Sequence, residues 1–135
     1  MLDLLPADLL LDGKTVVLDD AGRPLLLLFG HRRPTYVAFD LLIADGVDLR
    51  PLALSERKAK LVQIANRAEG WIAHTNGVVG EGRALYRTVV DADLEGIVAK
   101  NLADAYNPKQ TRWHKILNRH YGQRQERAEW FRERR

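Results

Sequence analysis

The sequence predicts an α+β fold with a mainly antiparallel sheet. Short apolar and β-branched segments occur along the chain together with segments whose apolar residues recur at helical spacing. These segments do not alternate regularly as strand, helix and strand, so the parallel sheet of a βαβ protein is not expected. The chain has 135 residues, 46% of them hydrophobic, which suits one domain with its own core.

The first part of the chain favours strands. Residues 15–19 are apolar and β-branched, and residues 25–29 are apolar again after the turn-forming sequence DAGRP. Two such runs around an Asp/Gly turn predict a β-hairpin. Residues 36–42 predict a third strand, and because apolar side chains occur on both of its faces, we expect it to be central and buried.

The remainder of the chain predicts two helices and three short strands. Ser55 can cap a helix that continues to about residue 68, since apolar side chains recur there at helical spacing and Gly70 supplies a stop. A second helix is expected at about residues 81–90. The strands are expected at residues 71–75, 96–100 and 112–117.

Positive charge is concentrated at the C-terminal end, although the net charge of the whole chain is only +3. From Lys109 onward there are nine basic and three acidic residues, so this segment carries +6 and the rest of the chain carries −3. A basic segment beside a mildly acidic body is one arrangement that binds a phosphate polymer. The alternative is a solvated, frayed tail.

Composition excludes several classes of function. The chain contains no Cys, which excludes disulfides, a thiol nucleophile and Cys-ligated zinc. No apolar run approaches the roughly 20 residues needed to span a bilayer, and no secretory signal is evident after Met1. We therefore expect a cytoplasmic protein without membrane contact.

Four motifs follow one another along the chain. They are LDGKTVVLD at residues 11–19, YVAFDLL with DGVDLR at residues 36–50, DLEGIVAK at residues 93–100 and WHKILN at residues 113–118. This ordered set resembles the nucleotidyltransferase domain of ATP-dependent DNA ligases. With h for a hydrophobic residue, the family motifs are LDGE-h-VhLD, FDLL-x-x-DG-x-DL, EGIVAK and W-x-K-h-K-N. Four ordered matches are specific, whereas any one alone would be weak.

The resemblance implies both a fold and a reaction. It implies a partial nucleotidyltransferase domain of ATP-grasp-like type in residues 1–118, followed by a basic, helical tail in residues 119–135, as in short bacterial members. In this family a Lys attacks the α-phosphate of ATP and forms a lysyl-AMP. The AMP then moves to the 5′-phosphate of a DNA nick, where the 3′-hydroxyl displaces it. The implied cofactors are ATP and Mg²⁺, the implied partner is nicked double-stranded DNA, and the implied role is DNA repair and recombination.

The resemblance also implies roles for individual residues. Phe39 aligns with the aromatic residue that stacks on adenine, although a core Phe in a buried strand is the alternative. Glu95 aligns with the metal-associated Glu, and Lys100 closes the same motif. Lys115 aligns with a Lys that faces the ATP phosphates. We therefore expect phosphate contacts from both lysines. Taken alone, residues 93–100 are also typical of a surface strand with charged ends.

Three positions depart from the family pattern. The nucleophile lies in K-x-D-G, but the residues two positions before the Asp of each Asp-Gly pair are Leu10 and Ile43. Lys14 replaces the Glu of LDGE, and Leu117 replaces the second Lys of the last motif. We therefore expect the chain to begin after the nucleophile and to form no AMP adduct alone, so its enzymatic activity stays open. The alternatives are a non-catalytic nucleotide- or DNA-binding remnant and one half of a split ligase, completed by a partner chain.

Overall fold

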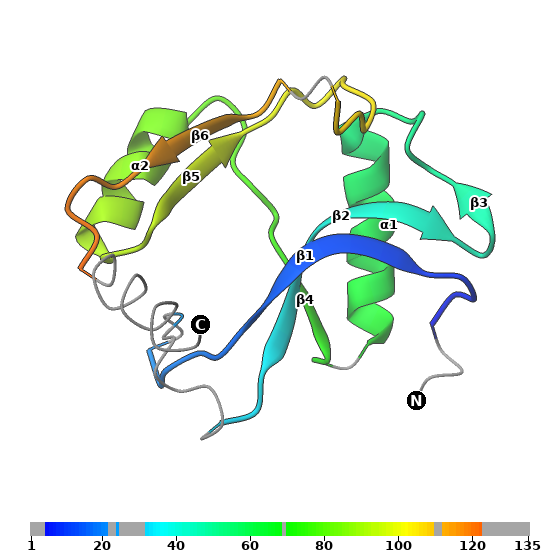
Figure 1. Cartoon of the computed structure of the whole chain (residues 1–135), viewed down its shortest axis with the longest axis horizontal. Coiled ribbons are helices and arrows are strands. Elements are labelled where there is room, and N and C mark those ends of the chain that lie inside the picture. The colour runs from blue at the N-terminus through cyan, green and yellow to red at the C-terminus, as the bar shows by residue number, and fades with distance from the viewer. Residues whose placement is uncertain (1–4, 22–23, 25–31, 69, 110–111, 123–135) are drawn as a thin grey trace, which may run out of the picture. The chain divides into compact units, whose positions relative to one another are not determined.

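The computed structural model describes residues 5–21, 24, 32–68, 70–109 and 112–122. The chain divides into two compact units, where the length alone suggested one domain (Figure 1). Unit 1 comprises Met1–Gly77 and Lys100–Arg112, and unit 2 comprises Val78–Ala99 and Trp113–Arg135. Each unit contains a sheet of its own, and the two are described separately below.

Unit 1 is built on a four-stranded sheet with one helix. The strands are β1 (Leu10–Val16), β2 (Thr35–Ala44), β3 (Val47–Asp48) and β4 (Ile72–His74), and the helix is α1 (Leu54–Arg67). β2 is central: β1 and β3 pair with it in antiparallel fashion, whereas β4 pairs with it in parallel. The predicted α+β class with a mainly antiparallel sheet is confirmed, and β4 is the exception to the antiparallel rule.

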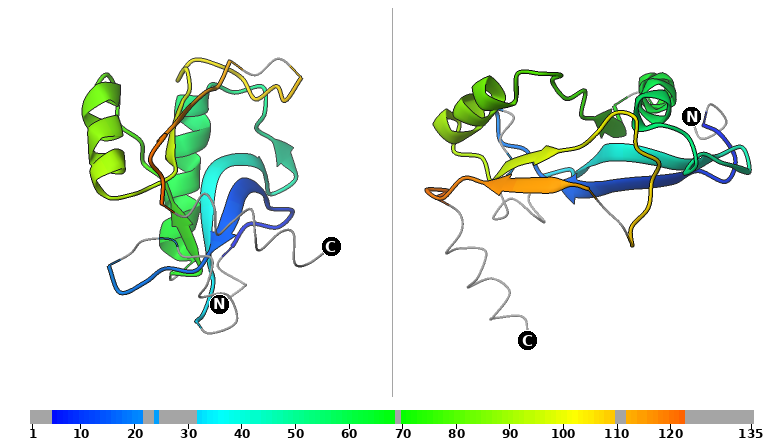
Figure 2. Two further views of the ribbon diagram at one scale, coloured as in Figure 1. Left: turned by 60° about the vertical axis from the view of Figure 1, so that its left-hand side comes forward. Right: turned by 90° about the horizontal axis from the view of Figure 1, so that it is seen from above.

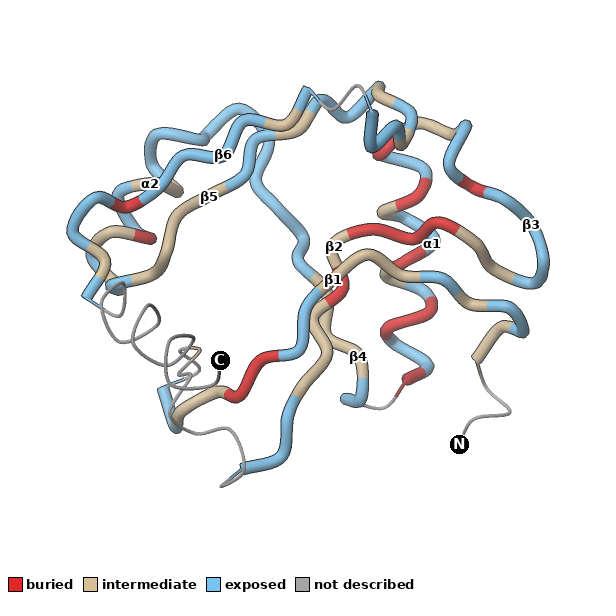
Figure 3. Tube along the Cα trace, in the orientation of Figure 1, coloured by how far each residue is buried: buried red, intermediate tan, exposed pale blue. Residues whose placement is uncertain are grey.

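The core of unit 1 lies between α1 and the sheet. α1 lies against one face of the sheet (Figure 2). Buried residues gather on α1 and β2 (Figure 3). The apolar core cluster consists of Ala38, Leu41, Leu49, Leu61 and Ile64. The prediction that residues 36–42 form a central, buried strand is therefore correct.

α1 begins without the side-chain cap that Ser55 was expected to provide. The helix starts at Leu54, and the residue in the N-cap position is Ala53. The Glu56 carboxylate accepts a hydrogen bond from the Ala53 backbone N–H at 3.2 Å. The first N–H groups of the helix donate to carbonyls of the segment after Lys100, which satisfies them without a Ser cap.

The expected hairpin lies partly outside the described residues, because residues 25–31 are not described. In the described part, the first strand spans Leu10–Val16 and pairs with β2. An isolated antiparallel bridge joins Leu18 to Pro24 across the predicted turn. The first strand thus begins five residues earlier than the β-branched run indicated, since Leu10–Gly13 also pair with β2.

Unit 2 contains a helix and a two-stranded antiparallel sheet. These elements are α2 (Gly82–Asp91), β5 (Gly96–Ala99) and β6 (His114–Leu117), close to the three predicted segments. Gly96 has φ +151°, and a Cβ there would lie 2.3 Å from the carbonyl oxygen of Ile116. The glycine of the DLEGIVAK motif is therefore required where β5 approaches β6.

No helix in the described part of the chain is long and apolar enough to cross a membrane. Residues 123–135 of the predicted basic, helical tail lie outside the described residues, and the described residues 119–122 contain no helix. That prediction, and the domain boundary at residue 118, stay predictions.

Candidate functional site

The Asp-Gly pair of the first motif lies where β1 and β2 approach closely. Asp12 is the cross-strand partner of Asp40, and the pairing register shifts between Asp12 and Gly13. A Cβ at Gly13 would lie 2.4 Å from the carbonyl oxygen of Val37, so only glycine fits there. The close approach places two carboxylates, Asp12 and Asp40, at neighbouring positions of the sheet.

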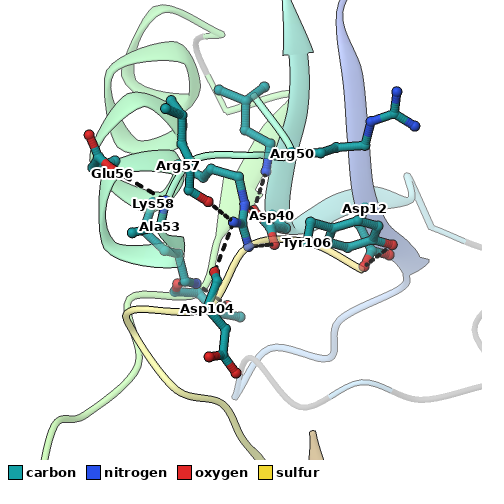
Figure 4. A network of polar contacts seen from close by, with 12 residues as sticks. Asp12, Asp40, Arg50, Ala53, Glu56, Arg57, Lys58, Asp104 and Tyr106 are labelled. Carbon is teal, nitrogen blue, oxygen red and sulfur yellow. Dashed lines mark hydrogen bonds and ion pairs between the residues drawn. The ribbon is translucent and has the colours of Figure 1, made fainter. Parts of the chain in front are cut away.

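Asp40 forms a buried ion pair with Arg57 of α1. The Asp40 side chain is 0% exposed and that of Arg57 is 2% exposed. Arg57 donates from Nε to Oδ1 and from Nη2 to Oδ2, both at 2.8 Å (Figure 4). The Leu41 backbone N–H also donates to Asp40 Oδ1 at 2.8 Å. This two-bond geometry offsets part of the cost of burying both charges.

Lys100 belongs to the same group of charges in unit 1. Burial lowers the pKa of Lys100, while the negative charges of Asp40 and Asp12 oppose that change and the positive charge of Arg57 adds to it. The lysine of the DLEGIVAK motif therefore lies within electrostatic reach of both carboxylates. Its side chain is half-buried.

Lys58 is a second lysine near this group. Its Nζ donates to the carbonyl oxygen of Thr75 and, at 3.2 Å, to Thr75 Oγ1. Burial lowers the pKa of Lys58, and the positive charge of Lys100 lowers it further, whereas Asp40 raises it. The side chains of Asp12, Asp40, Arg57, Lys58 and Lys100 together carry a net charge of +1.

Tyr106 is the last member of this group of charged and polar side chains and contacts Asp12. Its hydroxyl donates to Asp12 Oδ2 at 3.4 Å, and its ring centroid lies 5.8 Å from the guanidinium carbon of Arg57. Burial and the Asp12 charge both raise the pKa of Tyr106. The phenol therefore stays protonated at neutral pH and acts as a donor towards Asp12.

Phe39 lies on β2 between two fully buried residues, Ala38 and Asp40, and is itself half-buried. Because successive side chains of a strand point to opposite faces, Phe39 lies on the face opposite to the one on which Asp40 meets Arg57. The stacking role implied for Phe39 stays a prediction.

The two other predicted site residues come together in unit 2. Lys115 Nζ on β6 donates to Glu95 Oε1, just before β5, at 3.2 Å. The Lys115 side chain is 63% exposed and that of Glu95 is 34% exposed, so the pair adds little stability. Glu95 begins the EGIVAK sequence and Lys100 ends it, but the two residues belong to different units.

The positions that depart from the ligase pattern also have defined places. Leu10 and Ile43, which stand where a nucleophilic Lys would be needed, are cross-strand partners in β1 and β2. Lys14 is exposed on β1 opposite Val37. Leu117 is 40% exposed at the end of β6.

Sequence reasoning missed Arg57, Lys58 and Tyr106. A signal for Arg57 existed, because it lies four residues before Leu61 and seven before Ile64, on the apolar face of the predicted helix. An Arg on that face requires a buried partner, and Asp40 in an apolar strand is the complementary feature. Lys58 and Tyr106 carry no such signal, because neither lies on the apolar face of a predicted helix or strand.

Metal ligands are sparse in the described part of the chain, where no group of three or more His, Cys, Asp or Glu residues could hold an ion. Glu95 supplies one carboxylate in unit 2. One carboxylate fits the way Mg²⁺ usually binds, through one or two carboxylates together with substrate phosphates. The donor set therefore fits a metal that arrives with a nucleotide rather than one held by the protein alone.

Comparisons with known proteins relate the chain to DNA ligases. A family model described as ATP dependent DNA ligase domain matches residues 5–116. The chain is 36% identical over 115 residues to the multifunctional non-homologous end joining protein LigD of Pseudomonas aeruginosa. The matched region covers 78% of this chain and 14% of that protein. It is 29% identical to the SPbeta prophage-derived DNA ligase-like protein LigB of Bacillus subtilis, over 90% of this chain and 48% of that protein.

Solved structures agree with the sequence comparison. The ligase domain of LigD from M. tuberculosis matches with a TM-score of 0.67 and 29% identity, over 81% of this chain and 37% of that chain. A mycobacterial DNA ligase D complexed with ATP and MES matches with a TM-score of 0.68 and 29% identity, over 81% of this chain and 38% of that chain. In each of these matches the present chain spans less than half of the related protein or domain.

Proposed function

Because this chain belongs to the ATP-dependent DNA ligase family and has the nucleotidyltransferase fold of its adenylation domain, we propose that it binds ATP and nicked double-stranded DNA in a repair reaction. The observation that carries the proposal is the position of Lys100 in unit 1. The lysine of the DLEGIVAK motif is half-buried beside Asp12 and Asp40, in a group of charges that is net positive. A net positive, partly desolvated site attracts a phosphate group.

The ATP phosphates are the proposed ligand of the two motif lysines, and the adenine is the proposed ligand of Phe39. Arg57 already pairs with both oxygens of Asp40. The negative charges of Asp40 and Asp12 both act on Lys100, and the positive charge of Arg57 offsets part of the Asp40 contribution. In unit 2, Lys115 would exchange its exposed contact with Glu95 for a phosphate contact at little cost.

Glu95 is the residue that would hold Mg²⁺. A bound metal would stabilise negative charge on the phosphates, and a divalent ion at Glu95 would offset the charge that Lys115 otherwise balances. In unit 1, Lys100 would bind phosphate and Phe39 would orient the base, and in unit 2, Lys115 would bind phosphate.

We expect no covalent AMP adduct on this chain by itself. The residues in the K-x-D-G position, Leu10 and Ile43, have no nucleophilic group, and the second lysine of the last motif is Leu117. The chain is incubated with α-labelled ATP and Mg²⁺ or Mn²⁺ and then analysed by denaturing electrophoresis. A labelled band that disappears when a single Lys is changed to Ala would contradict the expectation.

Two alternatives give different outcomes in the same experiment. In a split ligase, adding a partner chain that carries K-x-D-G produces a labelled band on the partner. In a non-catalytic remnant, no band forms with any added chain, but ATP still binds. The presence of Lys14 and Leu117 at two family positions favours the second alternative over an intact autonomous enzyme.

DNA binding is expected to depend on the basic C-terminal segment. Replacing Arg124, Arg127 and Arg132 by Ser should weaken binding to a nicked duplex. Each lost phosphate contact reduces the steepness of the fall of log K with the logarithm of the salt concentration by about 0.9. Fluorescence anisotropy across a range of salt concentrations measures this slope. Lys60→Ser with Arg67→Ser, two exposed positions on α1, is the control for loss of positive charge. An unchanged slope, or no binding at low salt, would contradict the DNA-binding proposal.

A further inference from the structure

A short segment of unit 1, residues 101–106, connects two members of the candidate site. Lys100 directly precedes this anchored segment, and Tyr106 ends it. The Tyr106 hydroxyl donates to Asp12 Oδ2, and Lys100 is close enough to Asp12 and Asp40 for their charges to act on its pKa. The segment contains no helix or strand. Its placement therefore determines where both side chains lie relative to Asp12.

The start of α1 holds the anchored segment by backbone hydrogen bonds. The N–H of Leu54 donates to the carbonyl of Asp104, and the N–H of Ser55 donates to the carbonyl of Leu102, both at 3.0 Å. These N–H groups belong to the first turn of the helix, which has no intrahelical acceptors for them. The helix end and the segment thus satisfy each other.

Arg57 adds side-chain bonds that tie the same segment to the central strand. Its Nη1 donates to the carbonyls of Asp104 at 3.1 Å and Leu52 at 2.5 Å, while Nε and Nη2 hold Asp40. The Tyr106 ring lies beside the guanidinium (Figure 4). One planar group therefore joins β2, the turn before α1 and the anchored segment.

A purely stabilising role explains this arrangement less well. Buried ion pairs are often replaced by well-packed apolar residues without loss of stability. No apolar pair, however, can donate to the Asp104 carbonyl. A Lys in place of Arg57 has one ammonium group and cannot hold Asp40 through two parallel bonds while also reaching that carbonyl. The geometry of arginine matches the task of fixing the segment.

We propose that Arg57 is a positioning residue that fixes residues 101–106 on α1 and thereby holds Lys100 and Tyr106 beside Asp12 for phosphate binding. Its effect on phosphate binding rests on the proposed function, whereas its effect on the anchored segment does not. Arg57 itself is buried and touches no nucleotide in this role, so it acts through Lys100 and Tyr106.

The test compares the full chain with two variants at this position. Arg57→Lys keeps a positive charge, and the double variant Asp40→Leu with Arg57→Met replaces the ion pair by apolar side chains. Arg50→Met is the matched control, because Arg50 also pairs with an Asp through two bonds, at 2.9 and 2.8 Å, but does so at the surface.

Amide hydrogen exchange reports on the segment independently of ATP. Three reporter amides make hydrogen bonds between the anchored segment and the residues around it. The Leu54 N–H donates to the Asp104 carbonyl, and the Ser55 N–H donates to the Leu102 carbonyl. The Tyr106 N–H donates to the Arg50 carbonyl. The amides of Leu49 and Thr75 donate to β2 and serve as fold controls. In both Arg57 variants we expect the three reporter amides to exchange at least about tenfold faster, with the two control amides unchanged. In Arg50→Met all five should exchange as in the wild type.

ATP affinity, measured by calorimetry on the same samples, tests the consequence. A loosened segment should raise the dissociation constant for ATP about tenfold in both Arg57 variants and leave it unchanged in Arg50→Met. Reporter amides as protected as in the wild type would overturn the proposal. So would the loss of the control amides together with the reporters in both variants, because Arg57 would then serve the core alone. If the wild-type chain binds no ATP, the proposed function fails, and hydrogen exchange still decides the role of Arg57.

Discussion

Asp40→Ala is expected to lower the free energy of unfolding by about 3–5 kcal/mol, because it leaves a buried charge without its partner. Arg57 is 2% exposed, and its Nε and Nη2 donate to the Asp40 carboxylate. Removing the carboxylate also removes an acceptor of the Leu41 N–H. A loss of this size is a large share of the stability of an ordinary domain. Urea unfolding, followed by circular dichroism, measures the change.

Asp48→Ala provides the control for this measurement. Asp48 forms a similar two-bond pair with Arg50, and the hydrogen bonds from Arg50 lower the pKa of Asp48 to about 2. The side chains of this pair are 46% and 49% exposed, so solvent stabilises either partner after the other is removed. We expect a much smaller loss of stability from Asp48→Ala. Equal losses of unfolding free energy in the two variants would show that the buried pair contributes no more to stability than the exposed pair.

Lys100→Ala is expected to weaken ATP binding by about ten- to a hundredfold, the effect of losing a hydrogen bond between charged groups of about 1.5–3 kcal/mol. The half-buried Lys100 lies near Asp12 and Asp40, where its charge is less screened than at the surface. Calorimetry measures the dissociation constant. Lys60→Ala, at an exposed position of α1, is the matched control and should bind ATP as the wild type does. Equal affinity in the two variants would contradict the role of Lys100.

The pH dependence of ATP binding gives the same prediction a second readout. Burial lowers the pKa of Lys100 below the ordinary value of a lysine, and only the protonated form attracts phosphate. The affinity for ATP should therefore be highest at pH values below that lowered pKa and should fall as the pH rises through it. Lys100→Arg keeps its charge throughout this range, so the alkaline loss of affinity should disappear.

Local patterns predicted the elements well, because each depends on nearby residues. The apolar run at residues 36–42 led to β2, and the helical spacing from Leu61 to Ala68 led to α1. The cap of α1 was predicted wrongly at Ser55. Its first N–H groups are satisfied by carbonyls of Leu102 and Asp104, and such distant acceptors leave no local pattern.

Long-range pairing was outside the reach of sequence patterns. The parallel pairing of β4 with β2 joins Tyr36 to Ile72, and a three-residue strand carries too little pattern to show its direction. The division into two units likewise separates Lys100 from Glu95 within one motif. The motif identified both residues as candidates, but only the fold shows that Lys100 is grouped with Asp12 and Glu95 with Lys115.

Nuclear magnetic resonance of the ¹⁵N-labelled chain during an ATP titration tests the nucleotide-binding claim most directly. We expect saturable shifts of the backbone amides of Phe39, Lys100 and Tyr106, with no shift at Lys60 or Arg67, which are exposed on α1. The same titration on Lys100→Ala should need a much higher ATP concentration for saturation. An absence of saturable shifts in the wild type, or shifts confined to residues remote from Phe39 and Lys100, would contradict the nucleotide-binding claim.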